Sequence, residues 1–265
     1  MIKILCPVDF SQASINALEY ALQLGETIGA DLVEVTHCVF KAKKIQTDIR
    51  YTEEDEAEIK AQELEDRYKS RYSIKIGRSV FKGHPLDVLL PYIKAMGRNL
   101  IVVGTRGLTP VRNLTIGSFT EDLIFSTECP VLVIPEDHQF KRVENITLAT
   151  DDQFISVKET LVPLSKLVRS TDSKLHVVHV NQNGESAIDS LANLDQFFGG
   201  MDYSFYSIPV ERTVTTTLNR FVLKQKSDIL CMIHRDRGWM INIFHKSKVK
   251  EELFHLQVPL LVLSE

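Results

Sequence analysis

Four short stretches decide the fold of this chain: NLIVVG at residues 99–104, CPVLVIP at 129–135, DILCMI at 228–233 and VPLLVLS at 258–264. The last two stretches align with the first two, without a gap, at a constant shift of 129 positions. Each stretch is mostly apolar and contains valine or isoleucine, which is typical of strands buried on both faces. A repeat over this distance indicates an internal duplication.

The duplication extends outward from these stretches. Residues 2–8 form an apolar run that ends at Asp9, and residues 145–150 form a run that ends at Asp151. In both copies further apolar runs alternate with segments of helical periodicity, a pattern that predicts parallel strands connected by helices. We therefore expect an α/β fold of two similar doubly wound domains, each an open five-stranded parallel sheet flanked by helices.

The polar residues 136–142 predict the boundary, which gives domains at 1–138 and 143–265. The formal net charge of −4 comes without a dominant basic block, so nucleic acid is not an expected partner. The first apolar run is too short for a membrane span or a secretory segment, and we expect a cytoplasmic protein without a membrane partner. Four scattered cysteines predict buried free thiols and no metal site.

The loop that follows the first of these strands, GTRGLTPVRNLTIGSFTEDL at residues 104–123, carries the candidate chemistry. It contains three glycines and a serine at fixed spacing: Gly104, Gly107, Gly117 and Ser118. Ligands of open parallel sheets bind outside the carboxyl ends of the strands, and a helix N-terminus there favours an anion. Glycines admit close approach of the backbone, and the hydroxyls of Ser118 and Thr120 are candidate donors to phosphate. The alternative is that these glycines only cap and turn the chain.

With the spacing G-x2-G-x9-G-S, the chain resembles tandem universal stress proteins over essentially its whole length. The GHP turn at residues 83–85 and the final PVLVIP strand also suit that family. The resemblance implies binding of ATP or a related adenine nucleotide. Mg²⁺ is a candidate companion ion, with Asp9 as the carboxylate that could help to hold it. The resemblance places Asp9 beside the adenosine and the backbone of Cys38 and Val39 beside adenine. It assigns the ribose and phosphates to the following residues: Gly104, Gly107, Gly117, Ser118 and Thr120.

The second copy departs from the motif at each glycine. At the shift of 129, Ile233 replaces Gly104, Asp236 replaces Gly107 and Lys246 replaces Gly117, whereas Ser247 keeps the serine. A branched side chain and a carboxylate are unfavourable where backbone and phosphate must meet. We expect the second copy not to bind ATP in the same way.

Three functions remain open from the sequence. The leading one is a nucleotide-binding regulatory or sensor module of a stress response, acting on an unidentified protein partner. The alternative is a slow ATPase or nucleotidyl-transfer enzyme at the same site, although no catalytic residue is identified because no positioned general base accompanies the loop. The third is a structural interaction protein. Members of the family commonly pair through their fifth strands, so the resemblance implies an intramolecular pseudo-dimer, and a further homodimer stays open.

Overall fold

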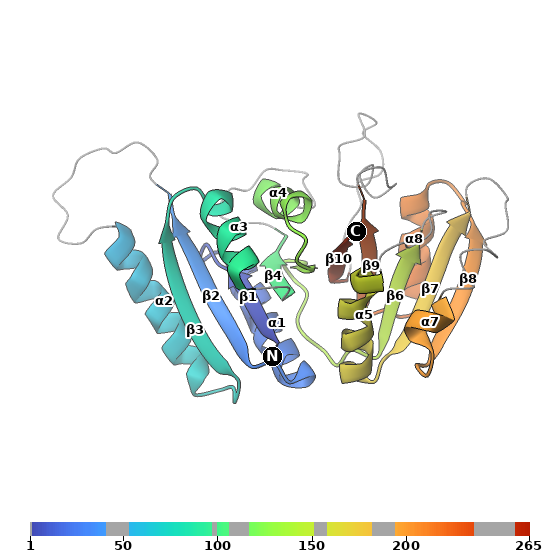
Figure 1. Ribbon diagram of the computed structural model, residues 1–265, viewed down its shortest axis with the longest axis horizontal. Coiled ribbons are helices and arrows are strands. Elements are labelled where there is room, and N and C mark those ends of the chain that lie inside the picture. Colours follow the sequence, from blue (N-terminus) through green and yellow to red (C-terminus); the bar gives the residue numbers. More distant parts are fainter. Residues whose placement is uncertain are drawn as a thin grey trace.

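A computed structural model describes residues 2–40, 53–96, 100–105, 117–150, 158–181, 194–235 and 258–265. Figure 1 shows one long twisted sheet with helices on both faces and with the two halves of the chain side by side. Within the described ranges, no helix is long and apolar enough to cross a membrane.

In the described part of the N-terminal half, five strands alternate with four helices. Its elements are β1 (Lys3–Pro7), α1 (Gln12–Ile28), β2 (Leu32–Val39), α2 (Glu53–Lys69), β3 (Lys75–Lys82), α3 (Pro85–Met96), β4 (Leu100–Gly104), α4 (Ser118–Ser126) and β5 (Val131–Ile134). Local sequence explains the ends of α1, because Ser11 caps its first turn and Gly29 ends it with a left-handed φ of 66°. Helix α3 begins at Pro85, a residue suited to a first helical position.

The C-terminal half repeats the order of strands. Its elements are β6 (Asn145–Thr150), α5 (Lys158–Thr171), β7 (Lys174–Asn181), α7 (Leu194–Phe198), β8 (Tyr203–Pro209), α8 (Val214–Lys224), β9 (Ile229–His234) and β10 (Leu260–Ser264). The expected α/β class with two five-stranded parallel sheets is confirmed, and the predicted strands agree with the observed ones to within about two residues at their ends.

The two five-stranded sheets are joined into one. The strand order is β3-β2-β1-β4-β5-β10-β9-β6-β7-β8, so each half has the same order and the fifth strands meet in the middle. Every pairing in the sheet is parallel except that between β5 and β10, which is antiparallel and places Leu132 opposite Leu261. These two leucines are equivalent in the duplication, so the local register is symmetric about this pair.

Apolar side chains cover both faces of the sheet and form two cores. One core lies under α1, α2 and α5 and includes Leu18, Val33 and Leu164, while the other lies under α3, α4 and α8 and includes Leu89 and Leu123. Because strand residues alternate between the faces, a strand buried on both sides must be apolar almost throughout. This burial explains why the strands stand out in the sequence as continuous apolar runs.

The segment between β5 and β6 packs on α1. The side-chain amide of Asn16 donates hydrogen bonds to the carbonyl oxygens of Pro135 (3.3 Å) and His138 (3.0 Å). The ring of Tyr20 meets that of Phe140 edge to face at 5.0 Å. The connection is therefore held against the N-terminal half along the polar stretch where the sequence predicted a boundary.

Candidate functional site

Three strands of the N-terminal half end at the same edge of the sheet, where the candidate residues gather. The β1–β2 pairing sets Pro7 opposite Thr36, and the β1–β4 pairing sets Leu5 opposite Ile101, both in parallel. The residues that follow these strands therefore lie at one carboxyl edge. Asp9 after β1 lies at this edge with the ends of β2 and β4.

Gly104, the last residue of β4, lies against the start of α1. A Cβ atom built at this position would lie 2.8 Å from the carbonyl oxygen and 3.0 Å from the carbonyl carbon of Ala13. Both are backbone atoms that cannot rotate away, so only glycine allows this approach of helix and strand. The role of Ala13 was not visible in the sequence, because it depends on a contact between segments 91 residues apart.

Helix α4 begins at the same edge without a side-chain cap. Its N-cap is Gly117, with φ −71° and ψ 154°, and the Gly117 N–H donates a 2.6 Å hydrogen bond to the carbonyl oxygen of Thr105. The N–H groups of residues 118–120 have no acceptor within the helix, as in the first turn of any α-helix. Ser118 is exposed at this first turn. Helix N-termini of this kind, with free N–H groups and the positive end of the helix dipole, are suited to an anion.

Thr120 has a different role from that of Ser118. Its side chain is buried, and its hydroxyl donates a 3.0 Å hydrogen bond to the carbonyl oxygen of Gly104. This bond ties the first turn of α4 to the end of β4. Thr120 therefore positions the helix N-terminus, and Ser118 is the hydroxyl that faces solvent. Gly107 lies outside the described residues.

Asp9 helps to set the start of α1. Its Oδ1 accepts a 3.0 Å hydrogen bond from the Ser11 N–H, and its own N–H donates to the Ser14 hydroxyl at 3.3 Å. Phe10, between Asp9 and Ser11, has a left-handed φ of 63°, which is uncommon for a residue with a side chain. The strand therefore turns sharply into the helix, with the Asp9 carboxylate at the turn.

A histidine on β2 supports this turn. The His37 ring packs against the Phe10 ring at 4.5 Å between centroids, and its Nδ1–H donates a 2.7 Å hydrogen bond to the carbonyl oxygen of Val8. Sequence reasoning did not pair His37 with Phe10. The only available signal was the matching histidine, His179, on the second strand of the other half.

The end of β2 supplies the residues that the resemblance assigned to adenine. Burial raises the pKa of the Cys38 thiol to about 11, so this thiol is neutral near pH 7 and not a nucleophile. The carbonyl oxygen of Val39 accepts a 3.0 Å hydrogen bond from the Gly83 N–H, which fixes the backbone here. The next residue, Phe40, is 58% exposed and meets the ring of His84 edge to face at 5.4 Å. This exposed aromatic pair was not predicted from the sequence.

At the equivalent edge of the C-terminal half, the described residues differ from those of the N-terminal half. Ile233, at the position of Gly104, is buried at the end of β9. Arg235 forms a salt bridge with Glu265, and both side chains are only about a tenth exposed. The remaining altered positions, Asp236, Lys246 and Ser247, lie outside the described residues.

Comparisons with known proteins point to one family. The profile of the Universal stress protein family matches residues 1–135. Universal stress protein MJ0531 of Methanocaldococcus jannaschii is 25% identical over 138 residues, which cover 50% of this chain and 81% of that protein. Universal stress protein MJ0577 of the same organism is 26% identical over 152 residues, which cover 50% of this chain and 93% of that protein. A solved universal stress protein from Archaeoglobus fulgidus shares 21% identity and the fold over 99% of this chain and 96% of its own, with a TM-score of 0.72.

Proposed function

Because this chain belongs to the universal stress protein family, we propose that its N-terminal half binds ATP or a related adenine nucleotide and acts as a regulatory or sensor module in a stress response. In this proposal residues 1–138 and 143–265 are the two domains, and the protein works in the cytoplasm. The bound nucleotide carries the signal, and an unidentified protein partner reads it.

The observation that carries the proposal is the uncapped first turn of α4. Gly117 has an extended N-cap conformation but no side chain to accept from the helix N–H groups. An N-cap residue normally satisfies one of these donors, and the preferred residues are serine, threonine, aspartate and asparagine. A phosphate group would satisfy them from outside, with the exposed Ser118 hydroxyl as a further donor.

The remaining candidate residues have distinct roles in this proposal. Gly104 lets α1 approach β4, and Thr120 ties α4 to the same strand. The backbone at Cys38 and Val39 borders the adenine, next to the exposed ring of Phe40, which offers a flat apolar face. Asp9 borders the adenosine and is the candidate contact for Mg²⁺, an ion that prefers carboxylate oxygens. Gly107 completes the proposed phosphate loop.

We propose further that the C-terminal half does not bind ATP in this way. Support comes from the buried Ile233 side chain at the position of Gly104, where a backbone approach like that of Ala13 needs a glycine. The guanidinium of Arg235 is paired with Glu265 and is therefore not a free partner for a phosphate. The duplicated chain then has one nucleotide site.

Contacts of α4 support a regulatory role. The ring of Phe125, near the end of α4, meets the ring of His234 in the C-terminal half at 4.8 Å, edge to face. Next to this contact, the Ser264 hydroxyl donates a 2.9 Å hydrogen bond to the carbonyl oxygen of Thr127. One helix therefore carries both the proposed phosphate end and a contact with the other half. In our proposal the two halves act as a pseudo-dimer through β5 and β10.

The decisive experiment places a cap on α4. Gly117→Asp suits the extended N-cap backbone and keeps the helix, but its carboxylate takes the N–H groups and repels phosphate. Gly117→Asn is the matched control, since it caps without a charge. We expect calorimetric titration to give ATP affinity at least tenfold weaker for Gly117→Asp than for Gly117→Asn, and weaker for Gly117→Asn than for the wild type, with unchanged thermal stability. Equal ATP affinity in all three proteins would refute the site.

A further inference from the structure

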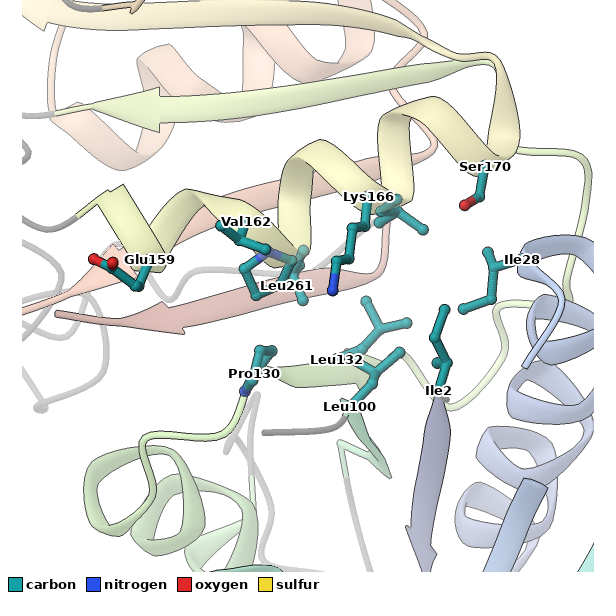
Figure 2. A pocket seen from close by; sticks show the side chains of 12 residues that line it. Ile2, Ile28, Leu100, Pro130, Leu132, Glu159, Val162, Lys166, Ser170 and Leu261 are labelled. Atoms are coloured by element: carbon teal, nitrogen blue, oxygen red, sulfur yellow. The ribbon is translucent and has the colours of Figure 1, made fainter. Parts of the chain in front are cut away.

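A second site candidate lies between the two halves, on the face of the sheet that carries α1 and α5. It is an apolar cavity of about 270 Å³. Its floor includes Leu132 of β5 and Leu261 of β10, the equivalent pair at the antiparallel junction. Helix α5 covers it with Val162 and Lys166, and Ile28 at the end of α1 closes one side (Figure 2). Both halves of the chain are therefore needed to form this cavity.

Lys166, an exposed residue of α5, gives the cavity one positive charge. Figure 2 shows the Lys166 ammonium directed from α5 toward the apolar floor, whereas the carboxylate of Glu159, one end of the lining, is directed away from it. Among the described residues, no carboxylate forms a salt bridge with Lys166. The rest of the lining is apolar apart from the hydroxyl of Ser170. A ligand that fits is therefore apolar over most of its surface and carries one negative group.

We propose that this cavity binds a straight-chain aliphatic carboxylate of about eight to ten carbons. The carboxylate would pair with Lys166, and the chain would lie over Leu132 and Leu261. The expected chain length is short because the cavity volume of about 270 Å³ lies just below the roughly 300–1,000 Å³ of pockets that hold drug-sized ligands. Val162, which is 43% exposed at the wall, would be covered by such a chain. A nucleotide does not fit, because a base and a sugar need more hydrogen-bonding partners than this lining offers.

This site is independent of the nucleotide site. It lies at the junction of the two halves on the α1 and α5 face, whereas α4 and its N-terminus belong to the core on the opposite face of the sheet. A ligand that contacts both β5 and β10 binds the folded junction and not the unfolded chain. It therefore stabilises the two-half arrangement by mass action.

The test is calorimetric titration of the full chain with sodium hexanoate, octanoate and decanoate, each below its micelle concentration. We expect one saturable site whose affinity rises about fourfold per methylene, the factor that corresponds to transfer of one CH₂ group from water. Dodecanoate should bind no more tightly than decanoate, because the cavity is then full. Lys166→Met should weaken octanoate about fivefold and leave octanol unchanged. Arg169→Met, on the same helix but outside the lining, is the matched control and should bind octanoate as the wild type does.

A second variant tests the cavity itself. Val162→Phe fills the space from a partly exposed position that tolerates a larger side chain, so the protein should fold and lose decanoate binding. Equal binding of decanoate to Val162→Phe and to the wild type would overturn the proposal. So would binding of decyltrimethylammonium as tight as that of decanoate. A loss of octanoate affinity in Arg169→Met as large as that in Lys166→Met would also overturn it. Self-association in sedimentation velocity that Val162→Phe abolishes would identify a second copy of the chain as the occupant instead. None of these results bears on ATP binding.

Discussion

Replacing Gly104 by alanine tests whether the end of β4 is a glycine for reasons of packing. The added Cβ would lie 2.8 Å from the carbonyl oxygen of Ala13, so α1 and β4 must separate by about half an ångström to restore ordinary contact. Overpacking of this kind costs about 1–3 kcal/mol. Because alanine has less conformational freedom than glycine in the unfolded chain, the substitution also stabilises the folded state by about 0.4–1 kcal/mol. We expect the free energy of unfolding to fall by about 1–2 kcal/mol and the melting temperature by roughly 2–8 °C.

Urea unfolding followed by far-ultraviolet circular dichroism measures this effect, with the m-value as a check that the unfolding transition is unchanged. Gly77→Ala is the matched control, because a Cβ there meets only a methyl group of Leu32, at 3.3 Å, and that side chain can move. We expect Gly77→Ala to be as stable as the wild type or slightly more stable. If Gly104→Ala and Gly77→Ala are equally stable, the packing argument for Gly104 is wrong.

Three further predictions concern the rest of the fold. Tyr92→Phe removes a 2.5 Å hydrogen bond to the buried Glu34 carboxylate, and we expect a loss of about 1.5–3 kcal/mol in urea unfolding; a loss below about 0.5 kcal/mol would contradict this. Burial raises the pKa of Glu65, but the hydrogen bonds and charges of Lys69 and Arg78 lower it by more. The pKa of Glu65 therefore lies below its usual value. The Glu65 carboxylate therefore stabilises the fold fully above about pH 4.3, and this stabilisation is lost as the pH falls through the lowered pKa. Glu65→Gln should flatten the acid side of a plot of unfolding free energy against pH. An unchanged plot would refute the assignment. Leu132→Ala and Leu261→Ala should each lower the free energy of unfolding by about 2–3 kcal/mol. Because the two residues are opposite each other, the loss in the double variant should differ from the sum of the single losses by at least about 0.5 kcal/mol. Strict additivity would argue against the β5–β10 junction.

The strands were predictable because burial on both faces leaves a mark in the sequence. The apolar run at residues 145–150 has the bounds of β6, and the run at residues 2–8 extends one residue beyond each end of β1. The register of β5 against β10 was not predictable from the residues, since two short apolar strands carry no polar position that fixes an antiparallel pairing. The family resemblance predicted that the fifth strands pair with each other. Composition and periodicity did not predict this pairing.

At the site, residue types were predictable but their contacts were not. The spacing of the glycines identified the loop, yet it could not separate Thr120, which bonds to Gly104, from Ser118, which is exposed. The approach of Ala13 to Gly104 and the stacking of Phe10 on His37 depend on distances between remote segments. Such contacts have no local pattern, because periodicity reports burial and not the identity of the neighbour.

The number of ATP molecules bound per chain tests the central claim most directly. Calorimetric titration of the full chain should give a stoichiometry of one. The N-terminal half combines Gly104 with an uncapped helix N-terminus at Gly117, whereas a buried Ile233 stands at the position of Gly104 in the other half. Gly117→Asp should abolish that single site. Two equivalent sites per chain, or one site that Gly117→Asp leaves intact, would contradict the proposal that the two halves of this duplicated chain differ in nucleotide binding.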